Sequence, residues 1–140
     1  MNNTVQIDSL IANEFAFEIG GEVATGVFRV SGLITYATDD DGNRIKPAFT
    51  VSKMVQRDAS NPFNQWLQET TNERDSDGER PRRDIAVVAI DDGVEIRRWE
   101  VKNAWIQSVS YSDFDSSSFE MVAETFVIRY DDIVETFSAS

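Results

Sequence analysis

Short runs in which apolar and polar residues alternate recur along most of this chain, and this pattern restricts the fold more than any other feature. In the first run, Phe15, Phe17 and Ile19 alternate with Ala16 and Glu18, which is the period of a strand buried on one face. The pattern predicts strands over residues 14–19, 27–38, 44–56, 84–90, 94–101, 104–112 and 119–130. Many short strands separated by turn residues predict a mainly β fold, a sandwich or a barrel.

One short α-helix is predicted, over residues 62–74. Asn61 suits the N-cap, and Pro62 suits the first helical position because its missing N–H would be unpaired there anyway. Phe63, Trp66, Leu67 and Thr70 then fall on one face of the helix.

The strands over 27–38 and 44–56 form a long hairpin whose tip is the turn Asp39-Asp40-Asp41-Gly42-Asn43. Gly32 weakens the first strand, and Pro47 cannot donate a hydrogen bond to a neighbouring strand. The faces are of mixed polarity, because Thr35, Tyr36 and Thr38 lie on one arm and Thr50, Ser52 and Lys53 on the other. This pattern predicts a ribbon that is wet on one side and completed at its edges by another chain.

The length of 140 residues predicts one domain, 1–140, in which residues 1–13 form an N-terminal arm. The net charge of −12 argues against tight binding to nucleic acid, although an acidic wall would suit a conduit to which DNA must not adhere. The sequence shows neither a signal peptide nor a spanning segment, so we expect residence in the cytoplasm and no membrane anchor.

The chain has no cysteine and no histidine. Disulfides, Ser-His and Cys-His nucleophiles and the usual zinc ligands are therefore excluded. Two acidic segments resemble calcium loops without completing one. The tip at 39–43 has Ala37 and Ala48 where ligands are required, and the segment with Glu73, Asp75 and Asp77 has Pro81 inside the loop. We predict no metal site, but a solvated hairpin tip and a charged loop over 73–83.

Other candidates for chemistry have structural explanations. The 25 acidic residues guarantee some carboxylate pair at the spacing of a glycosidase, so such a pair is uninformative. We expect the basic residues to pair with carboxylates within the chain or across an interface, and the large aromatic residues to lie in the core. The basic set is Arg80, Arg82, Arg83, Arg97 and Arg98, and the aromatic set is Trp66, Trp99, Trp105 and Phe126. No catalytic residue and no cofactor are predicted.

Taken in order, several of these segments resemble the tail tube proteins of contractile phages, R-type pyocins and extracellular injection particles. The segments are 15–19, 30–33, 64–67, 83–85, 99–105 and 124–133, of which the last two are the most characteristic. Two positions depart from the family pattern: Met54 follows Lys53 where the family often has glycine, and Ile106 follows Trp105 where it often has proline. Both departures concern local turn geometry.

The resemblance implies hexameric rings that stack into a hollow tube, in which the long hairpin joins those of five neighbours in a continuous barrel. It implies that the lumen hairpin contributes assembly residues and that two loops contact the next ring or the sheath. The hairpin residues are Val30, Thr35, Tyr36, Arg44, Lys46, Thr50 and Ser52, and the loop residues are Asp39, Asp40, Asp41, Asp75 and Asp77. If the lumen is acidic, carboxylates near Arg44 and Lys46 should offset them.

The resemblance also implies the partners and the location. The partners would be further copies of the chain, contractile sheath subunits, a baseplate hub, a tail terminator and transient DNA or protein cargo. The chain would be assembled in the cytoplasm, reside in a phage tail or injection particle, and perform no bond chemistry.

Three alternatives remain open at this point. A baseplate-end adaptor or tail terminator of the same fold would form a ring without a long tube. A monomeric β-barrel binding module would need an enclosed apolar pocket. A carboxylate-based hydrolase would depend on one particular Asp or Glu.

Overall fold

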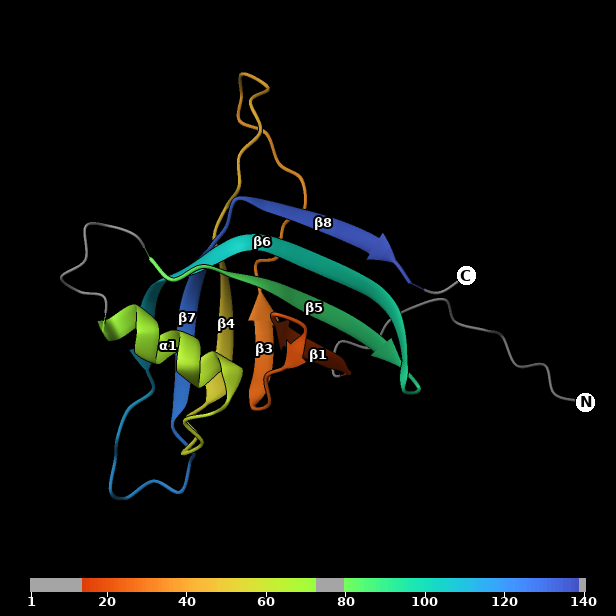
Figure 1. The fold of residues 1–140 in the computed structure, drawn as a ribbon. Coiled ribbons are helices and arrows are strands. Elements are labelled where there is room, and N and C mark those ends of the chain that lie inside the picture. Colours follow the sequence, from red (N-terminus) through yellow and green to blue (C-terminus); the bar gives the residue numbers. More distant parts are fainter. Residues whose placement is uncertain (1–13, 73–79, 139–140) are drawn as a thin grey trace, which may run out of the picture.

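The computed structural model describes residues 14–72 and 80–138. The described part is mainly β with one short helix, which confirms the predicted fold class (Figure 1). The elements are β1 (Phe15–Ile19), β2 (Glu22–Val23), β3 (Val27–Ser31), β4 (Phe49–Met54), α1 (Pro62–Asn72), β5 (Arg83–Asp91), β6 (Val94–Tyr111), β7 (Ala123–Arg129) and β8 (Asp132–Phe137). The predicted N-terminal arm, residues 1–13, lies outside the described residues.

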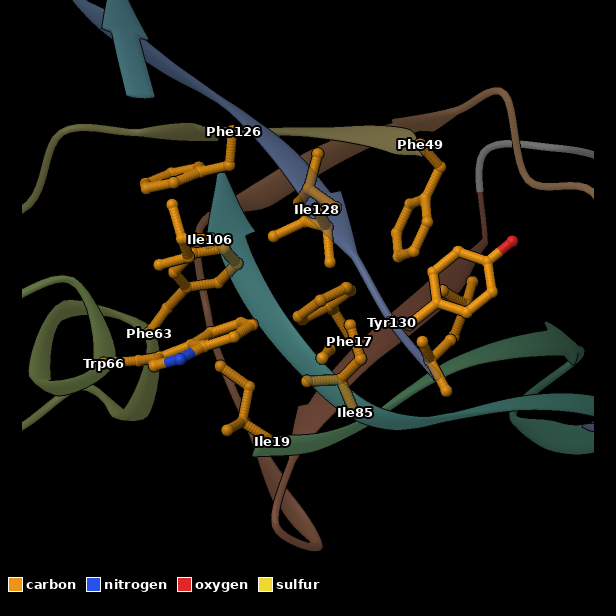
Figure 2. Packing of buried hydrophobic residues seen from close by; sticks show 14 of the residues in the cluster. Phe17, Ile19, Phe49, Phe63, Trp66, Ile85, Ile106, Phe126, Ile128 and Tyr130 are labelled. Atoms are coloured by element: carbon orange, nitrogen blue, oxygen red, sulfur yellow. The ribbon is translucent and has the colours of Figure 1, made fainter. Parts of the chain in front are cut away.

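The strands form one open antiparallel sheet in the order β2-β1-β5-β6-β7-β4-β3, with β8 paired to β6. The sheet folds over so that β1 and β5 face β4 and β7 across a shared core (Figures 1 and 2). The helix α1 packs against this shared core.

Strand β6 belongs to both halves of the sheet. Its first part pairs with β5 and β8, and its last part, residues 105–111, pairs with β7. The prediction of two strands, 94–101 and 104–112, is therefore wrong, because the chain passes from one to the other through a bulge. Asn103 has a φ of 52° there, a conformation that asparagine tolerates better than most residues. Its backbone N–H donates to Asp84 Oδ1 at 3.0 Å, and its side-chain amide donates to Asp131 Oδ2 at 3.1 Å.

The long hairpin is less regular than predicted. Strands are formed only by β3 and β4, and the segment between them carries one isolated bridge, between Thr38 and Arg44. Gly32, at a φ of 77°, ends β3, and no strand of the described part of the chain pairs with residues 32–48. The turn at the tip is confirmed, because Asp39 Oδ1 accepts hydrogen bonds from the N–H groups of Asp41 and Asn43.

Two further boundaries differ from the prediction. The strand expected over 119–130 begins only at Ala123, and residues 112–122 are a loop. The chain then forms β8, which the alternation pattern did not identify as a separate strand, and β8 continues along the same edge of β6 as β7.

The core is organised around Phe63 on α1. Its ring lies 5.5 Å from that of Phe17, 5.5 Å from that of Trp66 and 4.4 Å from that of Phe126, centroid to centroid (Figure 2). Asn61 caps the helix as predicted, since its Oδ1 accepts from the N–H of Phe63 at 2.9 Å. The assignment of Trp66 and Phe126 to the core is confirmed, and Trp99 packs at its margin.

Trp105 does not belong to this core cluster, contrary to the prediction. Its neighbour Ile106 is buried in the core, and alternation along β6 therefore turns Trp105 toward the other face of the sheet. The guanidinium of Arg82 lies over its ring at 4.3 Å.

The core also contains an ion pair between β4 and β7. Lys53 is fully buried, Glu124 is 4% exposed, and Lys53 Nζ lies 2.7 Å from Glu124 Oε1. Lys53 Nζ also donates to the carbonyl of Met54 at 2.9 Å. The sequence analysis placed Lys53 with the polar residues of a wet ribbon. That placement is wrong, because strand alternation puts Lys53 on the same side as the buried Val51 and Phe49.

We predict that Lys53→Met lowers the free energy of unfolding by about 3–5 kcal/mol, because it leaves the carboxylate of Glu124 buried and unpaired. The double variant Lys53→Met/Glu124→Leu should recover most of that loss, since it removes both charges. Urea unfolding measures both effects, and the exposed Lys46→Met serves as the control, expected within about 0.5 kcal/mol of the native chain. A double variant as unstable as the single one would contradict the prediction.

Candidate functional site: assembly surfaces

The sheet has one surface on which hydroxyl side chains gather. It is the side of β3, β4, β7 and residues 105–111 of β6 that points away from the core, and we call it the hydroxyl face. The strand register places its residues in rows: Arg29, Ser52, Thr125 and Ser110 in one row, and Ser31, Thr50, Val127 and Ser108 in the next. Met54, Trp105, Ala123 and Arg129 complete it.

Hydrogen bonds between side chains link neighbouring strands across this face. Ser31 Oγ lies 2.8 Å from Thr50 Oγ1, and Ser52 Oγ lies 3.1 Å from Thr125 Oγ1. Cross-strand hydroxyl pairs of this kind stabilise a sheet by about 0.2–1 kcal/mol each. The face therefore has a regular polar surface whose side chains are already partly satisfied.

The structure brings together two of the hairpin residues that the sequence analysis selected, Thr50 and Ser52, on the hydroxyl face. It places Val30 on the opposite side, where this residue pairs with Val51 and packs against the core. Alternation along β3 and β4 explains the difference. The residues added by the structure, such as Thr125 and Ser108, come from β7 and β6 and were missed because only the register reveals that they share this face.

The hydroxyl face ends at two strand edges that have no partner among the described residues. Strand β3 pairs with β4 alone, and residues 105–111 of β6 pair with β7 alone, because β5 reaches only as far as Ala104. Unpaired edges of a sheet present N–H and C=O groups that can pair with another chain. This four-stranded part of the sheet is therefore open on both sides.

The remaining hairpin residues lie in the loop over 32–48, which extends beyond one end of the strands (Figure 1). Arg44 donates to the carbonyl of Thr35 at 3.2 Å and lies 3.5 Å from Asp132 and 5.9 Å from the ring centre of Tyr36. The loop also carries Lys46, Asp39, Asp40 and Asp41, all exposed, whereas Asp75 and Asp77 lie outside the described residues.

One core residue anchors this loop. The hydroxyl of Tyr130 lies 3.0 Å from the carbonyl oxygen of Pro47 and 3.4 Å from that of Ile34, so it holds both arms of the loop. Burial of the ring raises the pKa of this hydroxyl, an effect that the charge of Arg44 partly opposes.

A second loop, residues 112–122, lies at the opposite end of the same strands. The antiparallel pairing of β4 with β7 requires this, because the first loop precedes Phe49 and the second precedes Ala123, and Figure 1 shows the two loops pointing in opposite directions. Both loops expose large apolar side chains: Ile34, Tyr36 and Ile45 in the first, and Phe114, Phe119 and Met121 in the second. Exposed apolar groups at two opposite ends indicate contacts with other molecules.

The arginines selected by the sequence analysis form ion pairs on the other half of the sheet. Arg98 lies 2.7 Å from Glu18 and 2.6 Å from Glu95, and Arg97 lies 3.1 Å from Glu135. Arg82 pairs with Asp131, and Arg83 with Glu69. For these four arginines, pairing within the chain is confirmed.

The described residues show no arrangement suited to metal binding. They contain no group of three or more acidic side chains that could hold a metal ion. A hollow of about 380 Å³ beside Glu18, Arg98 and Lys102 is open and charged, unlike the apolar pockets that bind small molecules. Within residues 14–72 and 80–138, no helix has the length and apolar character that crossing a bilayer requires.

The described residues thus form an open antiparallel sheet with two free edges, one capped helix and long loops at both ends. The match to a family is specific: residues 41–134 fit the T4-like virus tail tube protein gp19 family. This segment is more than half of the chain, and the chain belongs to that family, as the resemblance predicted. Its membership of this family makes the chain a structural tube protein.

Solved structures share the fold over nearly the whole chain. The anti-feeding prophage tube terminating cap has a TM-score of 0.75 at 19% identity, covering 98% of this chain and 97% of that one. A chain of the PVC extracellular contractile injection system sheath-tube complex has a TM-score of 0.72 at 19% identity and covers 93% of both chains. Hcp1 from the E. coli EAEC 042 pathovar has a TM-score of 0.61 at 17% identity, covering 89% and 91%. No curated protein matches the sequence.

We predict that Tyr130→Phe frees the loop over 32–48 and costs about 1 kcal/mol at neutral pH, the usual value of one hydrogen bond. The folded state raises the pKa of Tyr130 above its usual value of 10.0, so the unfolded chain loses this proton at a lower pH than the folded chain does. The stability contributed by this group is therefore present below that pH and is lost as the pH rises through the folded pKa.

The variant should accordingly lose less stability than the native chain when the pH is raised above 10, and its loop amides should exchange hydrogen faster. Urea unfolding at neutral and alkaline pH and hydrogen exchange measure these effects, with the exposed Tyr36→Phe as the control. Unchanged exchange in residues 34–47 would refute the anchoring role.

Proposed function

We propose that this chain is a structural subunit of the inner tube of a contractile tail or injection machine. We also propose that residues 1–140 act as a single domain. The family match supports the tube role. The observation that carries the assembly is the four-stranded part of the sheet with a free edge on each side. In a closed ring, β3 of one copy pairs with residues 105–111 of β6 in the next, and no edge remains exposed.

Six copies in a ring, with the hydroxyl face toward the centre, give a continuous barrel lined by Ser and Thr side chains. The ion-paired half of the sheet, with Arg97 and Arg98, then lies outward, where a sheath would surround the tube. A chain with the same fold comes from a sheath-tube complex, and another comes from a baseplate. These likenesses support sheath and baseplate as partners.

The two end loops supply the contacts between successive rings. They point in opposite directions along the strands, so the loop over 32–48 of one ring meets the loop over 112–122 of the next. Such head-to-tail contacts are heterologous and extend without limit when they do not close on themselves. Tyr36, Phe114 and Phe119 provide the apolar surface for this contact, while Asp39, Asp40 and Asp41 remain candidates at the rim, as the sequence analysis proposed.

The function is mechanical. A sheath that contracts around a stiff tube drives it through a target envelope, after which DNA or protein passes along the bore. The tube contributes rigidity through many backbone hydrogen bonds between subunits and performs no bond chemistry. Assembly takes place in the cytoplasm, and the mature location is the tail or particle.

A second candidate function is that of a tube terminator. The structure with a TM-score of 0.75 is a tube terminating cap, so the fold alone suits both roles. A terminator forms a ring on the end of a tube and does not stack further. The length of the assemblies formed by this chain separates the two functions.

We predict that cysteines introduced on the two free edges cross-link neighbouring copies into a covalent ring. Ser31→Cys combined with Ser108→Cys or Ser110→Cys tests two registers, and the native chain contributes no cysteine. Within one copy these positions lie three strand spacings apart, about 14 Å, whereas a disulfide needs Cα atoms within about 7 Å. Any disulfide therefore joins different copies.

Under oxidation, non-reducing gels should show a ladder that ends at the hexamer, with six-fold rings by negative-stain electron microscopy. Ser31→Cys/Glu100→Cys, in which the second cysteine lies on the ion-paired half of β6, is the matched control and should stay uncross-linked. Rings without a ladder in either pair would reject this edge-to-edge arrangement, and a monomer that resists assembly on a matching baseplate would reject the tube function.

We also predict that Tyr36→Ser/Phe119→Ser shortens tubes to single rings or short stacks, because both side chains are largely exposed, at 72% and 103%, and would be buried between rings. Tube length by electron microscopy measures the effect. Val94→Ser, 58% exposed at the start of β6, is the control and should leave the length unchanged. Tubes of native length from the double variant would show that these loops do not join the rings.

A further inference from the structure

The charge of the hydroxyl face differs from that of the rest of the protein. The chain has 25 acidic residues among 140 and a net charge of −12. The strand segments that form this face, β3, β4, β7 and residues 105–111 of β6, contain a single acidic residue, Glu124. That residue points into the core and pairs with Lys53. The hydroxyl face therefore carries no carboxylate.

Among the strand residues of the face, only Arg29 and Arg129 are charged; Arg82, over the ring of Trp105 at its margin, pairs with Asp131. Arg29 and Arg129 are both exposed, and neither forms an ion pair with another described residue, in contrast to Arg82, Arg83, Arg97 and Arg98. Arg129 is instead held by a hydrogen bond from its Nε to Oε1 of Gln107 at 2.7 Å, which leaves its charge uncompensated. In an acidic protein, two arginines without carboxylate partners on a surface free of acids make that surface cationic.

We propose that the hydroxyl face binds an acidic polypeptide, so that the bore of the assembled tube is a cationic, hydroxyl-lined channel for acidic protein cargo. The bore position rests on the proposed function, whereas the affinity of the face does not. The sequence analysis suggested an acidic wall from the net charge of −12, and the proposed wall is instead cationic. The difference arises because strand alternation places acidic and basic side chains on different surfaces of the chain.

A neighbouring copy would not neutralise Arg29 in the ring. The edge that joins β3 is residues 105–111 of β6, which contain no acidic residue. Arg29 lies in one row with Ser52, Thr125 and Ser110, so the row continues into the next copy through hydroxyl groups. Six copies then place a ring of guanidinium groups around the bore at the level of Arg29 and another at that of Arg129.

The chemistry of the face favours polypeptide over nucleic acid. Surfaces that bind single-stranded nucleic acid combine basic groups with aromatic rings on which bases stack. Trp105 on this face already has the guanidinium of Arg82 over its ring, and Phe28, at the bulge of β3, is a single exposed ring and not a series on which successive bases could stack. Duplex DNA carries one charge per 1.7 Å or so and would engage the arginines of every ring at once, which would hold it in place. An acidic polypeptide has a lower charge density and peptide groups that exchange hydrogen bonds with Ser and Thr.

The test uses the full chain, assembled and unassembled, with three labelled probes: a polyglutamate peptide, a polylysine peptide of equal length, and an oligothymidylate of equal charge. Polyglutamate should bind at low salt and be released at high salt, whereas polylysine should not depend on the two arginines. Arg29→Gln/Arg129→Gln should weaken polyglutamate binding about tenfold or more, since each arginine supplies a charge-assisted hydrogen bond. Arg57→Gln removes the same charge from an exposed position outside the face and should leave binding unchanged.

Electron microscopy of the same samples separates the two proposals. A chain that forms no rings even on a matching baseplate would overturn the proposed function, and polyglutamate binding by the unassembled chain would still test the affinity of the hydroxyl face. Polyglutamate binding that is absent, or equal in the native chain and the double variant, would overturn this inference even when tubes form. Tighter, arginine-dependent binding of the oligothymidylate would also overturn it, in favour of nucleic acid cargo. A map of the tube in which the guanidinium of Arg29 or Arg129 lies within 4 Å of a carboxylate of another copy would also overturn the inference.

Discussion

Strand β6 is the element on which the rest of the structure depends. Its 18 residues hold β5 and β8 along one part and β7 along the other, and β1 and β4 take their places from β5 and β7 in turn. A strand of this length is about three times the usual one. Because one strand runs through both halves of the sheet, the ion-paired half and the half with free edges are held at a fixed orientation. A load applied to one half is therefore transmitted to the other through backbone hydrogen bonds.

The bulge at Asn103 makes this arrangement possible. It lies near the end of the part of β6 that pairs with β5, one residue before Ala104, which still pairs with Arg83, and Asp84 and Asp131 hold it by hydrogen bonds. Bulges turn a strand and end pairing at a chosen position. Here the bulge shifts the register within the pairing with β5, and the free edge of residues 105–111 begins after Ala104, because β5 starts at its partner Arg83. Two carboxylates thus fix the kink beside the edge at which we propose that copies of the chain pair.

The same sheet distributes charge between surfaces. The ion pairs of Arg97 and Arg98 lie on one half, and a buried pair between Lys53 and Glu124 joins β4 to β7. The strand residues of the hydroxyl face include two arginines that have no ion-pair partner among the described residues. In the tube that we propose, this distribution would present different chemistry to the surroundings and to the cargo. It also shows why net charge, a property of the whole chain, is a poor guide to the wall of a channel.

The amino-acid sequence by itself determined the class of fold, the helix with its Asn61 cap and Pro62 start, the turn at 39–43 and the family. These features depend on local periodicity, capping and turn chemistry, which neighbouring residues specify. The tertiary structure alone decided the continuity of β6 through Asn103, the burial of Lys53, the outward position of Trp105 and the irregular loop over 32–48. Each of these depends on which strand lies beside which and in what register, and an alternating pattern gives the two faces of a strand without saying which one is buried.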